Sequence, residues 1–280
     1  MSKIDFLIIG AQKSGTTSLR ALLNNNPEKF YLANQELHFW DQEGQYANGK
    51  GLPKYLKNFE KGLPHQIVGE KTPRYLFSNS APKRLVKHFP EIKLVAILRN
   101  PVDRAYSAYW HGRRVGAIPA SRSFTQAIHE SEKYEKLLYG GLVKRGYYAE
   151  QLKNWMKYFP KEQFFVLQFE KMVGNPRLNG AELINFLEDS TSADDSNLKL
   201  HLPKRNVARK SKNQLVSKVI HRATHYGQLR GLRSKLMKNN LTEFQAPEMA
   251  PGDRQFLTQI YKEDAKALET LLGQEFDWFK

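Results

Sequence analysis

Apolar runs with the period of a strand alternate along the chain with stretches that have helical spacing. Strand-like runs lie at residues 4–9, 67–70, 94–99 and 164–169. Apolar residues recur with a helical period at 17–23, 81–88, 147–158, 178–187 and 252–272. The run at 94–99 is almost wholly apolar, which suits a central strand of a parallel sheet. The pattern predicts an α/β fold with three layers, in which helices cover both faces of a central parallel sheet.

Polar residues concentrate where two of these strands end. The first strand leads into the loop 10–17, and the strand at 94–99 ends with Arg99. Asn100 and Pro101 then begin a helix, as an N-cap and a first helical residue. Ligands of parallel sheets bind at the carboxyl ends of the strands. We therefore expect both strand ends to line a binding site.

The loop after the first strand reads GAQKSGTT and is close to a triphosphate-binding loop. Its glycines, at 10 and 15, and the hydroxyl residues that follow match G-x-x-x-x-G-K-[ST], but the lysine stands at 13. Such a loop points backbone N–H groups and a helix N-terminus at one anion. Further donors are Lys13 and the hydroxyls of Thr16, Thr17 and Ser18. The plainer alternative is a glycine turn with an exposed lysine, but the flanking strand and helix favour an anion site.

A second anion contact is predicted at Arg99 and Ser107. Ser107 lies about two helical turns beyond the strand end, so a forked guanidinium and a hydroxyl could reach one phosphate. In triphosphate enzymes an acidic strand end helps to hold magnesium, whereas this strand ends in a cation, so we expect no metal. The alternative is that Arg99 caps a carbonyl and Ser107 is merely exposed.

Composition narrows the classes of protein. The chain of 280 residues has no cysteine, which excludes disulfides, thiolate metal sites and cysteine nucleophiles. No apolar run approaches the ~20 residues needed to span a bilayer. Because a strand is predicted to begin by about Asp5, we expect no signal peptide. We expect a single domain over 1–280, located in the cytoplasm or at the inner membrane surface.

The positive charge is concentrated in one segment. The formal net charge is +16, and residues 199–238 contribute twelve Lys or Arg with no Asp or Glu. A charge of this size provides solubility or attracts a polyanionic partner. Apolar positions within 212–238 predict a cationic amphipathic helix, which we interpret first as a lid or packed helix. The alternatives are peripheral contact with an anionic membrane and guidance of an acidic acceptor.

Six segments, in order along the chain, resemble the PAPS-dependent sulfotransferases (PAPS is 3′-phosphoadenosine 5′-phosphosulfate), and most closely their heparan-sulfate N- and O-sulfotransferase branch. The likeness covers most of the chain except roughly 188–245. The segments are GAQKSGTTSL, QELHFWD, GEKTPRYLF, ILRNPVDRAYSAYWH, GYYAEQLKNWMKYFPKEQFFVLQFEKM and EFDWF.

The resemblance implies PAPS as donor and its desulfonated form, PAP, as product. It implies that Lys13 and the loop amides hold the 5′-phosphosulfate, and that Arg99 and Ser107 hold the 3′-phosphate. The expected donor-binding residues in the loop are Gln12, Lys13, Ser14, Gly15, Thr16, Thr17 and Ser18. The basic loop 202–215 stands where the branch has a disulfide-closed loop, so Arg205 and Lys210 are further candidates for the 3′-phosphate. The alternative is that residues 202–215 form a solvated basic loop.

On the acceptor side, the resemblance implies that Glu36 takes the acceptor proton. Lys71 would then contact the transferred sulfuryl group or the acceptor, or else serve as a structural partner of Glu70 or Glu36. His38 is the competing base, because an imidazole titrates near neutrality. If the segment ELHFW, residues 36–40, is extended, residues 36 and 38 share one face.

The predicted reaction is transfer of a sulfuryl group from PAPS to a hydroxyl or amine, most simply of a carbohydrate. In-line transfer needs alignment and stabilisation of charge more than covalent help. A lipid, a small metabolite or a protein tyrosine are alternative acceptors. A P-loop kinase and a basic nucleic-acid- or membrane-binding module are alternative classes, although we expect no nucleic-acid partner. The sequence does not predict an oligomeric state.

Overall fold

The computed structural model describes residues 4–131, 141–189, 199–200, 209–211, 216, 241–243 and 246–279. The chain divides into two compact units. The first contains Met1–Asn100, Tyr147–Pro203 and Glu263–Lys280. The second contains Pro101–Gly146 and Lys204–Lys262.

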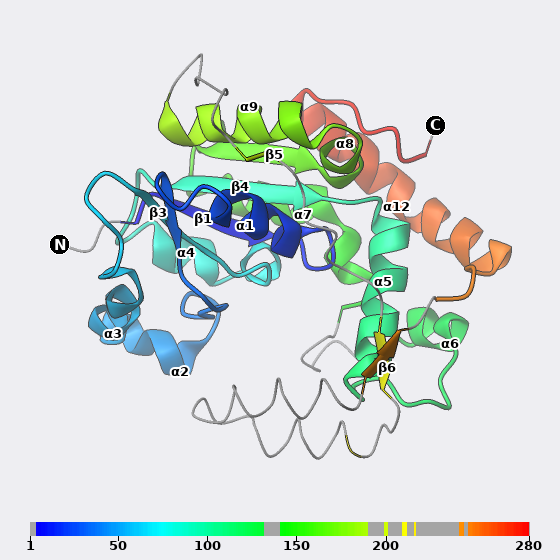
Figure 1. Cartoon of the computed structure of the whole chain (residues 1–280). Helices are drawn as coiled ribbons and strands as arrows, with labels where there is room; N and C mark the ends of the chain where they lie inside the picture. Colours follow the sequence, from blue (N-terminus) through cyan, green and yellow to red (C-terminus); the bar gives the residue numbers. More distant parts are fainter. Residues whose placement is uncertain are drawn as a thin grey trace. The chain divides into compact units, whose positions relative to one another are not determined.

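The first unit is built on a parallel sheet of five strands (Figure 1). The order across the sheet is β2-β3-β1-β4-β5, and every neighbouring pair is parallel. The strands are β1 (Phe6–Gly10), β2 (Phe30–Leu32), β3 (Ile67–Lys71), β4 (Lys93–Leu98) and β5 (Phe164–Gln168). The predicted central parallel sheet is confirmed. Strand β2 was not predicted, because three residues are too few to show a period.

Alternate side chains of β1 enter two different hydrophobic clusters. Phe6 and Ile8 pack in one cluster and Leu7 and Ile9 in the other, and all are 0% exposed. Helices α1 (Thr16–Asn24) and α9 (Pro176–Glu188) contribute to the first cluster. The second receives α4 (Ala81–Leu85), α7 (Tyr148–Trp155) and the end of α12 (Pro251–Leu272). The first unit therefore has the predicted three layers, with the sheet in the middle.

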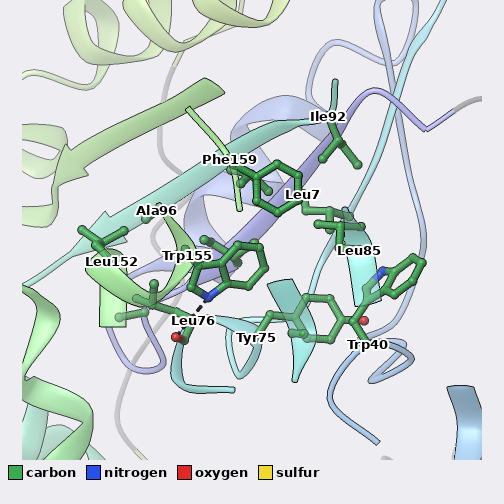
Figure 2. Packing of buried hydrophobic residues seen from close by; sticks show 14 of the residues in the cluster. Leu7, Trp40, Tyr75, Leu76, Leu85, Ile92, Ala96, Leu152, Trp155 and Phe159 are labelled. Atoms are coloured by element: carbon green, nitrogen blue, oxygen red, sulfur yellow. Dashed lines mark hydrogen bonds between the residues drawn. The ribbon is translucent and has the colours of Figure 1, made fainter. Parts of the chain in front are cut away.

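The second cluster extends beyond the sheet into an aromatic region. Figure 2 shows Leu7 and Ala96 of the sheet against Trp155, whose indole N–H donates to the carbonyl of Leu76 at 3.2 Å. Trp40 and Tyr75 lie beside one another at one side of the same cluster. This aromatic region lies next to the segment that carries Glu36 and His38.

The remaining elements of the first unit are short. They are α2 (Glu43–Tyr46), α3 (Leu52–Leu56), α8 (Phe169–Gly174) and the 3₁₀ turns η1 (Ala47–Gly49), η2 (Lys57–Phe59), η3 (Tyr75–Phe77) and η6 (Lys161–Gln163). The strand predicted at 164–169 ends one residue early, because Phe169 begins α8. The helix predicted at 178–187 begins earlier, at Pro176. The side chain of Asn175 caps this helix by accepting from the N–H of Leu178 at 3.1 Å.

The second unit contains α5 (Pro101–Arg114), α6 (Phe124–His129), η5 (Lys144–Gly146) and the first part of α12. Helix α5 begins at Pro101, as predicted. Strands β6 (Arg209–Ser211) and β7 (Leu241–Glu243) form an antiparallel pair. Among the residues that the structure describes, no helix combines the length and the apolar character that crossing a bilayer requires.

Candidate functional site

The strand order of the first unit places five chain segments in a row at the carboxyl edge of the sheet. Lys71, at the end of β3, lies beside the end of β1, since the neighbouring Thr72 N–H donates to the carbonyl of Ile8 at 3.1 Å. On the other side, the N–H of Ala11 donates to the carbonyl of Ile97 in β4 at 2.7 Å. After β1 the chain forms β2 and β3 on one side of that strand and then β4 and β5 on the other side. Parallel sheets bind ligands at the strand ends where the strand order reverses in this way.

The loop between β1 and α1 is tightly curled. Lys13 and Gly15 both have positive φ, 72° and 93°. A Cβ at Gly15 would lie 2.6 Å from the ring of Phe169, and a Cβ at Gly10 would lie 2.6 Å from Leu76. Both distances are shorter than any ordinary contact, so the two glycines of the motif are required by space, and Gly15 also by its backbone conformation.

The amides at the start of α1 lie where the sequence predicts an anion cradle. Within the described chain, the N–H groups of Gly15, Thr16 and Thr17 have no backbone acceptor, as expected for a helix N-terminus. The first turn of α1 contains no acidic residue that would compete with a bound anion. The N-terminal end of the helix dipole therefore favours an anion here.

Side chains of the loop differ in their exposure. Thr16 and Ser18 are buried, whereas Thr17 is exposed and Gln12 and Lys13 are half-buried. Ser14 is 0% exposed, and its Oγ has no hydrogen-bond partner among the residues described. The N–H of Ser14 donates to the carbonyl of Ala11 at 3.2 Å and so closes the turn.

Arg99, which directly follows β4, is held by two neighbours, and Asn100 by a third. Its carbonyl accepts from the hydroxyl of Tyr148 at 2.9 Å, and its guanidinium carbon lies 5.1 Å from the centre of the Phe169 ring. The next N–H, of Asn100, donates to the carboxylate of Glu170 at 2.9 Å. Ser107 is half-buried in α5, within the second unit. The shared phosphate site of Arg99 and Ser107 stays a prediction.

Glu36, His38 and Lys71 come together, although they are distant in sequence. The ammonium of Lys71 lies 2.5 Å from Oε1 of Glu36, and Nε2 of His38 lies 3.6 Å from Oε2. The segment is not extended, because His38 has a φ of 54° in the left-handed region. Residues 36 and 38 therefore do not share a strand face, and that expectation was wrong. A turn at His38 brings the two side chains together instead.

Asp41 completes this cluster and was not among the predicted site residues. Its Oδ2 lies 3.3 Å from both Nδ1 of His38 and Nε of Arg74, and its side chain is 2% exposed. His38 is thus held between two carboxylates. The signal was present in QELHFWD, where an acid follows the histidine by three residues, but only a turn makes that spacing a contact.

The cluster determines the charges of its members. Burial alone would raise the pKa of Glu36, but the hydrogen bond from His38 and the charge of Lys71 outweigh it and lower the pKa to about 2. Burial alone would lower the pKa of His38, but hydrogen bonds to Asp41 and Glu36 raise it to about 9. At neutral pH, His38 is therefore a cation, which argues against its role as the base.

Glu70 precedes Lys71 in β3 and is fully buried. Burial raises the pKa of Glu70 to about 7, even though hydrogen bonds from Tyr55, Thr72 and Tyr75 lower it. These three hydroxyls donate at 2.8, 3.0 and 3.0 Å. Lys71 contacts Glu36, which is one of the two structural partners that the sequence left open for it.

The predictions for the basic segment fall largely beyond the described residues. Arg205 lies outside them, and of Lys210 only the backbone, within β6, is described. The helix predicted over 212–238 lies outside them as well, apart from Val216, which is exposed. The described residues contain no group of three or more His, Cys, Asp or Glu that could hold a metal ion.

Two curated relatives share about a third of their residues with the chain. Heparan sulfate glucosamine 3-O-sulfotransferase 5 of Homo sapiens is 33% identical over 187 residues, which cover 61% of this chain and 49% of that protein. The bifunctional heparan sulfate N-deacetylase/N-sulfotransferase of Drosophila melanogaster is 33% identical over 218 residues, covering 69% and 20%. The chain thus spans about half the length of the first relative and a fifth of the second.

Solved structures share the fold. A sulfotransferase from Alicyclobacillus acidocaldarius aligns over 100% of both chains with a TM-score of 0.73 and 23% identity. Mouse sulfotransferase SULT7A1, solved as a complex with PAP, aligns over 96% of this chain and 87% of its own with a TM-score of 0.55 and 16% identity. The central parallel sheet with a P-loop-like connection after β1 is therefore the fold of these enzymes. The family model for the sulfotransferase domain matches residues 3–269, and the chain belongs to that family.

Proposed function

We propose that the protein transfers a sulfuryl group from PAPS to a hydroxyl or amine of a glycan. The main support is the adjacency of two features at the carboxyl edge of the sheet. A curled loop and the N-terminus of α1 follow β1, and the ion pair of Glu36 and Lys71 lies at the end of the neighbouring strand β3. One feature suits a charged donor, and the other suits removal of a proton from an acceptor.

The loop fits the 5′-phosphosulfate end of the donor. The glycine at 15 leaves no side chain between the loop backbone and the Phe169 ring, and the first turn of α1 brings amides without a competing acid. PAPS supplies an activated sulfuryl group attached to a phosphate that can leave. Mouse SULT7A1, which shares the fold, was solved with PAP.

Lys13 and the loop amides stabilise charge in this proposal. The oxygen between phosphorus and sulfur gains negative charge as the transfer proceeds, so donors aimed at it lower the barrier. A lysine at position 13 stands at the turn itself, where its φ of 72° helps to curl the chain. Arg99, packed on Phe169, holds the 3′-phosphate.

Glu36 acts as the base for the acceptor. With a pKa of about 2, its carboxylate is a weak base while it is paired with Lys71. Movement of the Lys71 ammonium from Glu36 toward the transferred group removes that positive neighbour and raises the basicity of Glu36. His38, already a cation, stays between Glu36 and Asp41 and orients the carboxylate.

A glycan acceptor is supported by the relatives and by charge. Both curated relatives are named for action on heparan sulfate. A net charge of +16 favours an anionic polymer over a neutral small molecule. One relative is named as a 3-O-sulfotransferase and the other as an N-sulfotransferase. The test below therefore compares acceptors that offer oxygen and nitrogen.

Two measurements test the proposal. Thermal unfolding is followed with PAP, adenosine 5′-phosphate or ATP with magnesium, since a ligand that binds the native state raises its stability. Transfer of a radiolabelled sulfuryl group from PAPS is followed with heparan sulfate, its N-desulfated form and a simple phenol. We expect the largest stabilisation with PAP and transfer to the glycans. Magnesium-dependent turnover of ATP, with no response to PAP, would overturn the proposal.

A further inference from the structure

Glu70 is a fully buried carboxylate that the proposed chemistry does not use. It lies on β3, one residue before Lys71, and alternation along the strand places it on the same face as Val68, toward the aromatic region of the second cluster. An isolated charge there would be costly, so its partners must offset the loss of water. Those partners are the three hydroxyls of Tyr55, Thr72 and Tyr75, and each of them has a second hydrogen bond.

The second hydrogen bonds all lead to the segment that carries the catalytic candidates. The N–H of Leu37 donates to Oγ1 of Thr72 at 3.1 Å, and the N–H of Phe39 donates to the hydroxyl of Tyr75 at 3.0 Å. The indole N–H of Trp40 donates to the hydroxyl of Tyr55 at 3.1 Å. Three separate relays therefore join residues 37, 39 and 40 to one carboxylate.

The direction of each relay is fixed by the chemistry of its ends. Backbone and indole N–H groups can only donate, so each hydroxyl must accept from the segment and turn its own proton toward Glu70. The ionised carboxylate, which only accepts, can satisfy all three hydroxyls at once, whereas a protonated carboxyl would present an O–H of its own. A glutamine of the same shape would instead present an N–H₂ to one of them.

The relays hold a strained backbone in place. His38 has a φ of 54°, in the left-handed region that side chains other than glycine seldom adopt. The N–H groups on both sides of it, at 37 and 39, are the ones that the relays fix. Such a conformation persists only where the surroundings hold it. It is also what turns His38 back toward Glu36 and Asp41.

We infer that Glu70 is a positioning residue, which orients Glu36 and His38 by fixing residues 37–40 through the hydroxyls of Tyr55, Thr72 and Tyr75. The inference rests on the proposed function, because it assigns Glu70 to the acceptor side of that reaction. It makes Glu70 necessary for turnover but not for holding the donor.

The test uses hydroxyl deletions that remove no carboxylate, imidazole or ammonium group. Thr72→Val removes the acceptor for the N–H of Leu37, and Tyr75→Phe removes the acceptor for that of Phe39. Tyr31→Phe is the matched control, because its hydroxyl donates to the carbonyl of Asn58 and takes no part in the relays. Glu70→Gln tests the hub itself in the full-length chain.

The first readout separates turnover from donor binding. We expect Thr72→Val, Tyr75→Phe and Glu70→Gln to lower kcat roughly 10–100-fold, as small misplacements of catalytic groups do. The KM for PAPS and the thermal shift with PAP should stay at wild-type values. Tyr31→Phe should change neither. A general structural defect would weaken donor binding and turnover together.

The second readout does not depend on activity. The imidazole of His38 is titrated by NMR and assigned with His38→Gln. The carboxylates of Glu36 and Asp41 flank His38, while Lys71 pairs with Glu36 and Arg74 with Asp41. The buried Glu70 also interacts electrostatically with His38. Loosening this arrangement should shift the titration of His38 down by roughly one unit in Thr72→Val and Tyr75→Phe, because its carboxylate partners move away.

The two hypotheses fail in different ways. If the wild-type protein transfers nothing from PAPS, the proposed function fails, and the titration of His38 still tests the relays. If the wild-type protein is active and both hydroxyl variants match Tyr31→Phe in kcat and in the titration of His38, the role of Glu70 is overturned. If Glu70→Gln does not fold, the two hydroxyl variants decide the question alone.

Discussion

The loop at 10–15 and the segment at 36–41 lie at the same edge of one sheet but are constructed differently. The loop presents backbone amides, and its shape depends on two glycines and the start of a helix. The segment presents side chains, and its shape depends on three hydroxyls and a buried carboxylate from other parts of the chain. A site made from backbone is specified locally, whereas a site made from side chains is specified by distant contacts.

This contrast predicts that donor binding and turnover can be separated by substitution. Substitutions in the loop and at Arg99 should affect both donor binding and turnover. Residues of the segment should affect turnover alone. Four substitutions, from the largest expected effect to the smallest, challenge or refine that division.

Lys13→Ala should have the largest effect. Removing one group that stabilises the leaving oxygen typically lowers turnover about 10²–10³-fold. Steady-state transfer of the labelled sulfuryl group measures it. Lys83→Ala, which removes an exposed lysine from α4, is the control and should behave like wild type. Normal turnover in Lys13→Ala would show that the displaced lysine has no part in the reaction.

Glu36→Gln should lower kcat about 10²-fold or more, which is the usual contribution of a general base. The thermal shift with PAP should remain, because Glu36 belongs to the acceptor side. Glu60→Gln changes an exposed carboxylate of the same unit and serves as the control. A loss of the PAP response in Glu36→Gln alone would remove the division between the two regions.

Arg99→Ala should weaken PAP binding about 10–100-fold, the usual cost of a charged hydrogen bond to phosphate. Binding of adenosine 5′-phosphate, which lacks the 3′-phosphate, should change little. Calorimetric titration of both ligands measures the difference. Arg177→Ala, on the exposed surface of α9, is the matched control. Equal losses for the two ligands would contradict a role for Arg99 at the 3′-phosphate.

His38→Gln should have the smallest effect, and it should depend on pH. The pKa of His38 is raised in the folded protein from its ordinary 6.5 to about 9. Its contribution to stability, on the order of 3 kcal/mol, is therefore complete below pH 6.5 and is lost as the pH rises through 9. Urea unfolding across this range should show the gap between wild type and variant closing with rising pH.

The control for this experiment is His65→Gln, which changes an exposed histidine. A gap that widened with rising pH would reverse the sign and would mean that His38 is neutral in the folded state.

The lowered pKa of Glu36 affects the stability of the protein at acidic pH. Its contribution is present above pH 4.5 and is lost as the pH falls through about 2.

The sequence predicted the donor side more fully than the acceptor side. The apolar run at 94–99 and the glycine spacing at 10 and 15 carry their structure in local pattern, and both were confirmed in the fold. Glu36 and Lys71 were identified by family resemblance and His38 by the chemistry of its imidazole, but their mutual geometry was not predicted. It depends on the left-handed turn at His38, and the hydroxyls that hold this turn lie 15 to 36 positions away from their partners.

Glu70 illustrates what a sequence does not show. In GEKTPRYLF it is one charged residue beside another, and only the three hydroxyls that converge on it reveal its role. Tyr55 belongs to α3, a helix of five residues that no periodicity predicts. The pKa values of the site likewise follow from packing, since the same side chains in water would titrate in their ordinary ranges.

Strand β1 has every one of its five residues buried, with neighbours on both faces. A strand enclosed in this way offers few substitutions that natural selection can tolerate, and an inserted residue would exchange its two faces. Changes of donor preference between related enzymes should therefore accumulate after Gly10, in the exposed parts of the loop and of α1. Libraries aimed at a new donor should spare positions 6–10 and vary the residues that follow.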